Sequence, residues 1–308
     1  FTTATNVYNV AIGYDAGVSV TTGVQNTIVG GLAGDAITSG NANVALGYFS
    51  LGGNTLGSKS VAIGSSALQN QNFTTATDAF NVAVGHNAGV SVTTGVHNTL
   101  IGASAGDALT AGGSNTVLGR DALSADTKGS RAVAIGEAAL QAQNFTTATE
   151  NNNVAVGYAA GNAVTTGESN TLIGGRAGDA LTASSNNTAV GTNALTADTL
   201  GARSVAIGSA ALANQNFTTA TNAYNVAVGT LAGNAVTTGV ENTLIGGLAG
   251  DALTTGDANV ALGYNSLAAD TAGNASIAIG KNALAAQNTS GDVFNTAVGF
   301  AAGAAITT

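Results

Sequence analysis

The side chains that could do chemistry in this chain are few and do not cluster. His86 and His97 are the only histidines, cysteine is absent, and no Asp or Glu recurs beside either histidine. A metal site or an activated nucleophile would need such a partner. We therefore predict that both histidines decorate the surface. The sequence offers no catalytic or metal-binding residue and no cofactor site, and we expect a protein that is not an enzyme.

Aspartates recur in two motifs, "AGDA" and "ADT". Because equivalent copies lie one long repeat apart, one chain cannot gather them around an ion, although a threefold axis could. We interpret them as solvated turn residues. The copies are Asp35, Asp107, Asp179 and Asp251 in the first motif, and Asp126, Asp198 and Asp270 in the second.

A basic residue recurs at Lys59, Arg131 and Arg203, and Ala275 breaks the series. Two interpretations stay open. The column could form inter-chain salt bridges to a column of aspartates, or it could be an ordinary exposed charge that contributes little to stability.

The composition indicates a repetitive β-structure. Only 7% of the residues are charged, glycine supplies 44 positions, and proline is absent, which excludes collagen. A net charge of −9 with dispersed basic residues argues against nucleic acid or an anionic membrane as a partner. The chain has no long apolar run, and it begins and ends inside repeats, so we expect a segment of a longer protein whose anchor lies elsewhere.

Two nested repeats organise the chain. The long repeat is marked by "FTTAT", which starts at positions 1, 73, 145 and 217. Within it, a five-residue motif starts at positions 9, 26, 43 and 60, and then restarts at 81 after a longer gap. We predict one repetitive rod segment over residues 1–308, with repeats starting near 1, 73, 145 and 217 and a partial repeat from 289. Each recurrence of the short motif is read as one coil of a solenoid.

The motif predicts a short strand followed by a bend. Numbering each coil from the first motif residue, positions 2 to 4 are mostly aliphatic or Thr, and position 5 is always Gly. Asn at position 1 is expected to hydrogen-bond from coil to coil as a ladder. The structural residues predicted first are Asn9, Gly13, Asn26, Gly30, Asn43, Gly47, Gly64 and Gly85.

Both faces of the predicted strand are apolar, which is typical of a strand buried on both sides. We place position 3 on the outer side, where larger residues such as Ile28 and Leu100 would vary the height of the contact surface from coil to coil. We also expect a second strand that ends near the Thr at position 13. A coil as short as the motif spacing encloses little core, so the sequence favours a closed homotrimer.

The insertion "QNFTTAT" after every fourth coil is the sharpest candidate for a binding site, because loops on a rigid scaffold often carry function. In one interpretation its residues are exposed contacts, with rings of Phe along the rod. In the other, the Phe folds back and covers apolar surface of the solenoid, and the threonines lie in solvent. The candidate contact residues are Phe73, Thr74, Thr75, Phe145, Thr146, Thr147, Phe217, Thr218 and Thr219.

These motifs resemble a known family. "SVAIG" at 60–64 and 204–208, with "AVAIG" and "SIAIG" in the same column, resembles the head repeats of trimeric autotransporter adhesins, and "NTAVG" resembles repeats of phage tail fibres. The resemblance covers essentially the whole chain. It implies a left-handed parallel β-roll, three chains wound into one rod on a cell or virion surface, and a role in adhesion.

Three classes of function remain open at this stage. The leading one is the shaft or head of an extracellular trimeric fibre that attaches through many weak sites, in an adhesin, a phage tail fibre or a matrix filament. Its partners would be copies of itself and an unidentified host-cell or matrix receptor, with no nucleic acid and no small-molecule substrate. An ice-binding solenoid with a Thr ladder and a β-helical enzyme are the less favoured alternatives.

Overall fold

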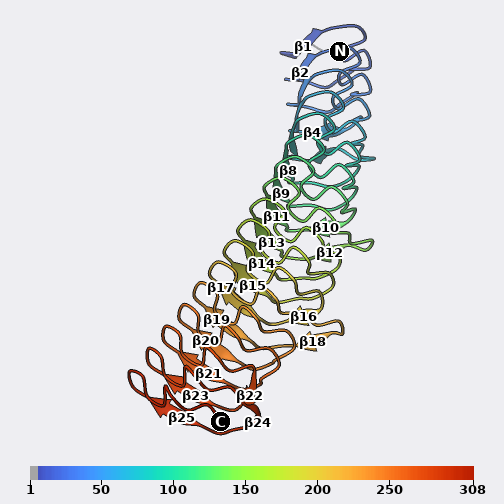
Figure 1. Ribbon diagram of the computed structural model, residues 1–308. Helices are drawn as coiled ribbons and strands as arrows, with labels where there is room; N and C mark the ends of the chain where they lie inside the picture. Colours follow the sequence, from blue (N-terminus) through green and yellow to red (C-terminus); the bar gives the residue numbers. More distant parts are fainter. Residues whose placement is uncertain (1–5) are drawn as a thin grey trace. The chain divides into compact units, whose positions relative to one another are not determined.

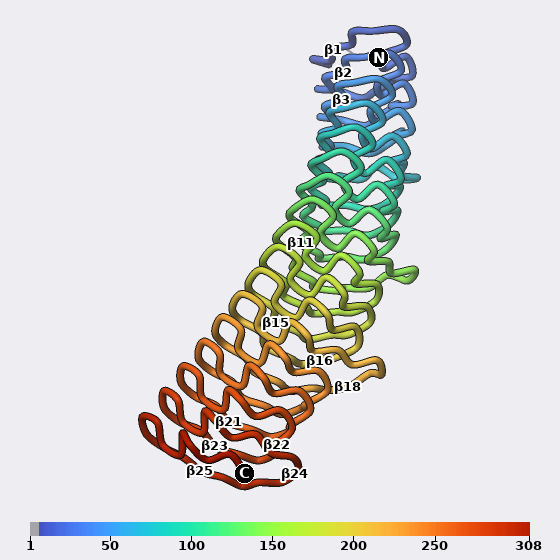
Figure 2. Tube along the Cα trace, in the orientation of Figure 1, coloured from blue at the N-terminus to red at the C-terminus, as the bar shows by residue number. Residues whose placement is uncertain are grey.

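The computed structural model describes residues 6–308, which form an all-β parallel solenoid. The chain folds as two compact units, residues 1–152 and 153–308, and the described residues of each form a stack of coils (Figures 1 and 2). No helix occurs among the described residues, so none is long and apolar enough to cross a membrane. The predicted fold class, an all-β parallel solenoid with one coil for each copy of the short motif, is confirmed.

The first unit is built on one three-residue strand per coil. Each strand pairs in parallel with the strand of the next coil, position for position, so that Val10 lies opposite Thr27 and Ala11 opposite Ile28. The strands are β1 (Val10–Ile12), β2 (Thr27–Val29), β3 (Val44–Leu46), β5 (Val61–Ile63), β7 (Val82–Val84), β8 (Thr99–Ile101), β9 (Thr116–Leu118) and β11 (Val133–Ile135).

The second unit repeats the arrangement, with Val154 opposite Thr171 in the same register. Its strands are β13 (Val154–Val156), β14 (Thr171–Ile173), β15 (Thr188–Val190), β17 (Val205–Ile207), β19 (Val226–Val228), β20 (Thr243–Ile245), β21 (Val260–Leu262), β23 (Ile277–Ile279) and β25 (Thr296–Val298).

A second strand, predicted for every coil, is found only beside the three insertions and beside residues 287–294, which take the place of a fourth insertion. There, short parallel pairs link each of these segments to the coil before it (Figure 1). Elsewhere in residues 6–308 the second half of the coil is turns, so that part of the prediction is wrong. The pairs are β4 (Gly57–Ser58) with β6 (Thr77–Asp78), β10 (Gly129–Ser130) with β12 (Thr149–Glu150), β16 (Gly201–Ala202) with β18 (Thr221–Asn222), and β22 (Ala272–Asn274) with β24 (Ser290–Asp292).

Position 3 faces the interior of the solenoid, contrary to the expectation that it faces outward. Ile28 and Leu100 are buried, whereas the residues on either side of them in β2 and β8 are at least partly exposed. The larger residues at this position therefore fill core space. The Ala at position 8, as in Ala33, is also fully buried.

Residues of neighbouring coils have complementary volumes in the core. A Cβ placed on Gly89, at position 9, would lie 2.6 Å from a methyl carbon of Leu100 in the next coil and 3.1 Å from one of Leu68 in the preceding coil. Where position 9 is itself Leu, as in Leu68, position 3 is small, as in Ala62. Large and small residues thus alternate so that successive layers interdigitate.

The Asn ladder is confirmed and closes each coil as well as linking neighbours. Asn170 accepts a hydrogen bond at its side-chain oxygen from the backbone N–H of Asn187, at 3.0 Å. Its amide nitrogen donates to the Ser184 carbonyl within its own coil, at 2.9 Å. The ladder is buried, and it satisfies backbone groups that the turns leave unpaired.

Candidate functional site

The outer ladder is a regular and largely apolar surface of each unit. We define it as the residues at positions 2 and 4 of the three-residue strands, on either side of the buried position 3. Position 4 is always aliphatic, and it remains partly exposed, as in Leu118 at 46% and Ile173 at 38%. In the isolated chain, therefore, the expected double burial of the strand is only half realised. An apolar stripe of this regularity is unusual on a monomeric surface.

Aromatic side chains extend the outer ladder beyond the bend at position 5. Tyr48, Tyr158 and Tyr264 occupy position 6 and are exposed by more than half. Their rings add amphipathic area to the edge of the apolar stripe, and rings of this kind are enriched where proteins contact one another.

The insertions bury their phenylalanines. Phe73, Phe145 and Phe217 are each 5% exposed, so the interpretation of these rings as exposed contacts is wrong and the fold-back interpretation is confirmed. The Phe217 carbonyl accepts hydrogen bonds from the Leu200 N–H, at 3.1 Å, and the Thr199 hydroxyl, at 2.8 Å. These contacts fasten the start of the insertion to the coil before it.

The predicted threonines lie at the exposed tips of the insertions. The three pairs are not brought together into one site, because each insertion follows a different coil. The pairs are Thr74 and Thr75, Thr146 and Thr147, and Thr218 and Thr219.

A buried polar network lies beneath each insertion. Asp198 is 0% exposed and accepts hydrogen bonds from the backbone N–H groups of Gly201, at 2.9 Å, and Phe217, at 3.1 Å. It also accepts one from the Gln215 amide, at 2.6 Å. Asp126 makes the equivalent contacts to its own insertion. The prediction that these aspartates are solvated is therefore wrong.

The sequence carried an overlooked signal for this network. Position 12 is Val, Ile or Leu in the first two coils of each period, but Asn or Asp in the third and Gln in the fourth, as in Asn54 and Gln71. A polar residue in an otherwise aliphatic column marks a buried hydrogen-bonded group. Here it marks where the insertion is attached.

Burial raises the pKa of the Asp198 carboxyl, and the hydrogen bonds from Gln215 and from backbone N–H groups oppose this only in part. Desolvation also raises the pKa values of Asp35, Asp107 and Asp251. Asp35 and Asp107 each have a buried carboxylate oxygen without a hydrogen-bond partner. Within residues 6–308, however, no group of three His, Cys, Asp or Glu side chains is placed to hold a metal ion.

The basic column pairs within the chain. Lys59 lies 2.7 Å from Asp78, and Arg131 lies 2.7 Å from Glu150, so in two of three copies the partner is an acidic residue of the insertion. In the single chain these residues form exposed pairs with the insertion, and the inter-chain bridge considered from the sequence stays a prediction. Arg203 differs, because it donates a hydrogen bond to the Tyr224 hydroxyl, at 2.7 Å.

Both histidines are exposed in the structure. The ring of His97 stacks on that of Phe80, with centroids 5.6 Å apart, while His86 lies at position 6 of its coil and is exposed. Both placements agree with the surface positions predicted from the sequence.

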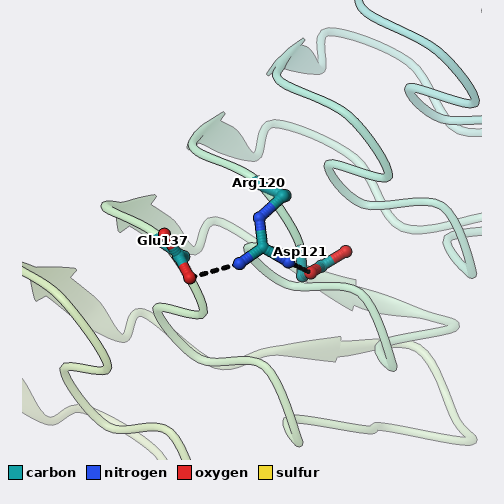
Figure 3. Close-up of polar contacts among 3 residues, drawn as sticks. All are labelled: Arg120, Asp121 and Glu137. Carbon is teal, nitrogen blue, oxygen red and sulfur yellow. Dashed lines mark hydrogen bonds and ion pairs between the residues drawn. The ribbon is translucent and has the colours of Figure 1, made fainter.

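Arg120 forms the densest charged contact of the first unit. Its guanidinium pairs with Asp121 at 2.6 Å and with Glu137 of the next coil (Figure 3). All three side chains are substantially exposed, so this cluster contributes little to stability.

The Thr column at position 13 is engaged in the fold. The Thr21 hydroxyl donates to the Thr38 carbonyl of the next coil, at 3.1 Å, and Thr38 donates to Thr55 in the same way, at 3.2 Å. Because these hydroxyl protons are used within the chain, the column is a poor template for ordered water.

No family model matches the chain, and no curated protein matches it. The resemblance to adhesin head repeats and to tail-fibre repeats therefore stays a prediction.

Proposed function

We propose that this chain is the shaft or head of an extracellular trimeric adhesin, which attaches to surfaces through many identical weak sites. The observation that carries the proposal is the outer ladder, which carries an aliphatic side chain at position 4 of every coil and is left partly exposed by the single chain. Burial of such a stripe releases about 25 cal/mol for each Å² of apolar surface. The occupant that we propose is another copy of the same chain, because its stripe has the same spacing of one repeat per coil.

Exposed insertions on a rigid scaffold support the adhesive role. Each insertion is anchored by a buried Phe, and in the second and third insertions a buried Asp also bonds to the Phe N–H, so the tip threonines extend from a fixed base. Three chains would multiply these tips, and linked weak sites give strong attachment through effective concentration.

A phage tail fibre or an extracellular matrix filament would use the same trimeric rod, and these remain the alternative proposals within this class. Ice binding is a weaker alternative, since the Thr hydroxyls at position 13 are already bonded within the fold. A β-helical enzyme finds no support in the arrangement of titratable groups described above.

The experiment that tests adhesion uses beads coated so sparsely that each carries a single assembly of the folded chain, because a dense coat would itself link separate monomers. Attachment of the beads to cultured cells and to extracellular matrix layers is then counted. A variant with Val228→Lys and Ile245→Lys places charges in the outer ladder and should remain monomeric. Thr238→Lys places a charge at an exposed residue outside both the outer ladder and the insertions, and serves as the control.

We expect wild-type beads to attach and the double variant to lose about 10²-fold or more of its avidity. Equal attachment by the wild type and the double variant would contradict a trimeric adhesin. Failure of wild-type beads to attach to any cell or matrix layer would count against adhesion and favour a mechanical filament.

A further inference from the structure

A cavity of about 390 Å³ lies beside the third insertion, within the second unit. Three successive coils contribute its polar wall, and Leu200 with several alanines completes it. A volume in this range suits a small organic ligand or one sugar residue. The polar lining residues are Ser184, Ser185, Asn186, Arg203, Thr221 and Asn222.

Arg203 differs from its equivalents in lacking an acidic partner. Lys59 and Arg131 each pair with an insertion carboxylate, whereas Asn222 occupies the corresponding place in the third insertion. Among residues 6–308, no carboxylate lies within ion-pair distance of Arg203. The Arg203 guanidinium donates one hydrogen bond to the Tyr224 hydroxyl, and its central carbon lies 5.5 Å from the centroid of the Tyr224 ring. These two contacts hold the guanidinium in place at the cavity.

Ser184 supplies a second, independent observation. Its side chain is 5% exposed, it lines the cavity, and its hydroxyl has no hydrogen-bond partner. The equivalent residue of every other coil without an insertion is Gly. A Cβ on Gly112 would lie 2.2 Å from the Gly129 carbonyl oxygen, so a serine requires a local change in the backbone. A buried hydroxyl without a partner costs stability, and a ligand in the cavity would satisfy it once the serine side chain turns toward the cavity.

The remaining polar groups suit a polyhydroxylated ligand. Ser185 accepts a hydrogen bond from the Glu168 N–H, at 2.9 Å, and keeps its own proton as a donor. Asn186 and Asn222 offer carboxamides that both donate and accept, and Leu200 offers an apolar surface to a sugar ring. The guanidinium fork matches one carboxylate in bidentate geometry.

We propose that this cavity binds one acidic sugar residue, a uronate or a sialate, through its carboxylate on Arg203. Arg203 is the one cationic residue that lines the cavity, and the chain as a whole has a net charge of −9, so the cavity favours a singly charged group over a polyanion. The inference rests on the proposed adhesive function, for which it names the receptor class: an acidic glycan of a cell surface or matrix.

The test titrates the whole folded chain with glucuronic acid and N-acetylneuraminic acid, and with glucose and a sulfated glucose as competitors, by calorimetry. Two variants remove the site: Arg203→Gln deletes the cation, and Asn222→Asp restores the acidic partner found in the other insertions. Arg131→Gln makes the same change at a paired arginine and is the matched control. Thermal melts confirm that each variant is folded.

We expect an acidic sugar to bind the wild type and Arg131→Gln equally, and to bind Arg203→Gln and Asn222→Asp about tenfold more weakly or worse. Neutral or sulfated sugar binding as tightly as the acids would overturn the proposal, as would undiminished binding in both variants. No binding of either acid to the wild type would also overturn it.

The solution mass of the same samples separates this inference from the proposed function. A trimer that binds no acidic sugar overturns the cavity proposal alone and leaves the fibre standing. A monomer that binds the acids through Arg203 supports the cavity and counts against the trimeric fibre.

Discussion

Two adjacent glycines, Gly174 and Gly175, allow a sharp test of how the coils stack. Gly174 occupies position 5 and has a φ of +134°, a conformation that residues with a side chain rarely adopt. A Cβ added there would lie 2.6 Å from both the carbonyl carbon and the carbonyl oxygen of Gly191 in the next coil. A Cβ on Gly175 would meet nothing within 4 Å, and Ala103 occupies the same position in another coil.

The magnitude for Gly174→Ala combines two costs. The strained φ costs about 1–3 kcal/mol, and overlap with the neighbouring backbone costs about as much again. We therefore expect a loss of about 2–6 kcal/mol in the free energy of unfolding. Gly175→Ala should be neutral or stabilise by about 0.4–1 kcal/mol, because it restricts only the unfolded chain.

Urea titration followed by circular dichroism measures both variants, and amide hydrogen exchange localises the effect. The Gly191 N–H, which donates to the Ile173 carbonyl at 2.7 Å, should exchange faster in Gly174→Ala than in Gly175→Ala. Equal stability of the two variants would refute the reasoning that a backbone contact between coils excludes every side chain at position 5.

Three further predictions concern the buried groups. Asp198→Asn should gain stability relative to the wild type as pH rises above 3.8, because the folded pKa of Asp198 is raised and its ionisation then costs the folded state more. Urea titrations at pH 3 and pH 7 would contradict this if the free energy of unfolding of the variant, minus that of the wild type, were no more positive at pH 7 than at pH 3. Phe217→Ala should cost about 3–5 kcal/mol and Thr218→Ala less than about 0.5 kcal/mol, and equal melting temperatures would show that the ring does not anchor the insertion. Asn242→Ala should cost about 1–3 kcal/mol by orphaning the Gly256 carbonyl and the Asn259 N–H, and unchanged hydrogen exchange at Asn259 would be inconsistent with the ladder.

The regular part of the fold is readable from the sequence because each column has one physical cause. The Gly at position 5 reflects a positive φ and a backbone contact, and the Asn at position 1 reflects a buried ladder. The solenoid, its coil length and its strands follow from these columns. The direction of position 3 did not follow, because both faces of the strand are apolar and periodicity alone cannot say which one points inward.

The candidate site was harder to predict because it depends on exceptions to the repeat. Phe217 can be buried because Gly201 has no side chain. A Cβ on Gly201 would lie 2.7 Å from the Phe217 ring. Arg203 lacks an acidic partner because Asn222 stands where the other two insertions have Asp78 and Glu150. The sequence shows this difference, but its effect on Arg203 is apparent only when the two residues are known to be neighbours. Positive φ values at residues such as Leu68 also left no signal, since bulky residues rarely adopt them.

Light scattering on the folded chain in dilute buffer tests the central claim most directly. The claim is that the outer ladder is buried against copies of the same chain. It predicts a mass near three times the 29.4 kDa of one chain, and a fall to 29.4 kDa for the variant with Val228→Lys and Ile245→Lys. A wild-type chain that is stable and soluble as a monomer of 29.4 kDa would contradict it.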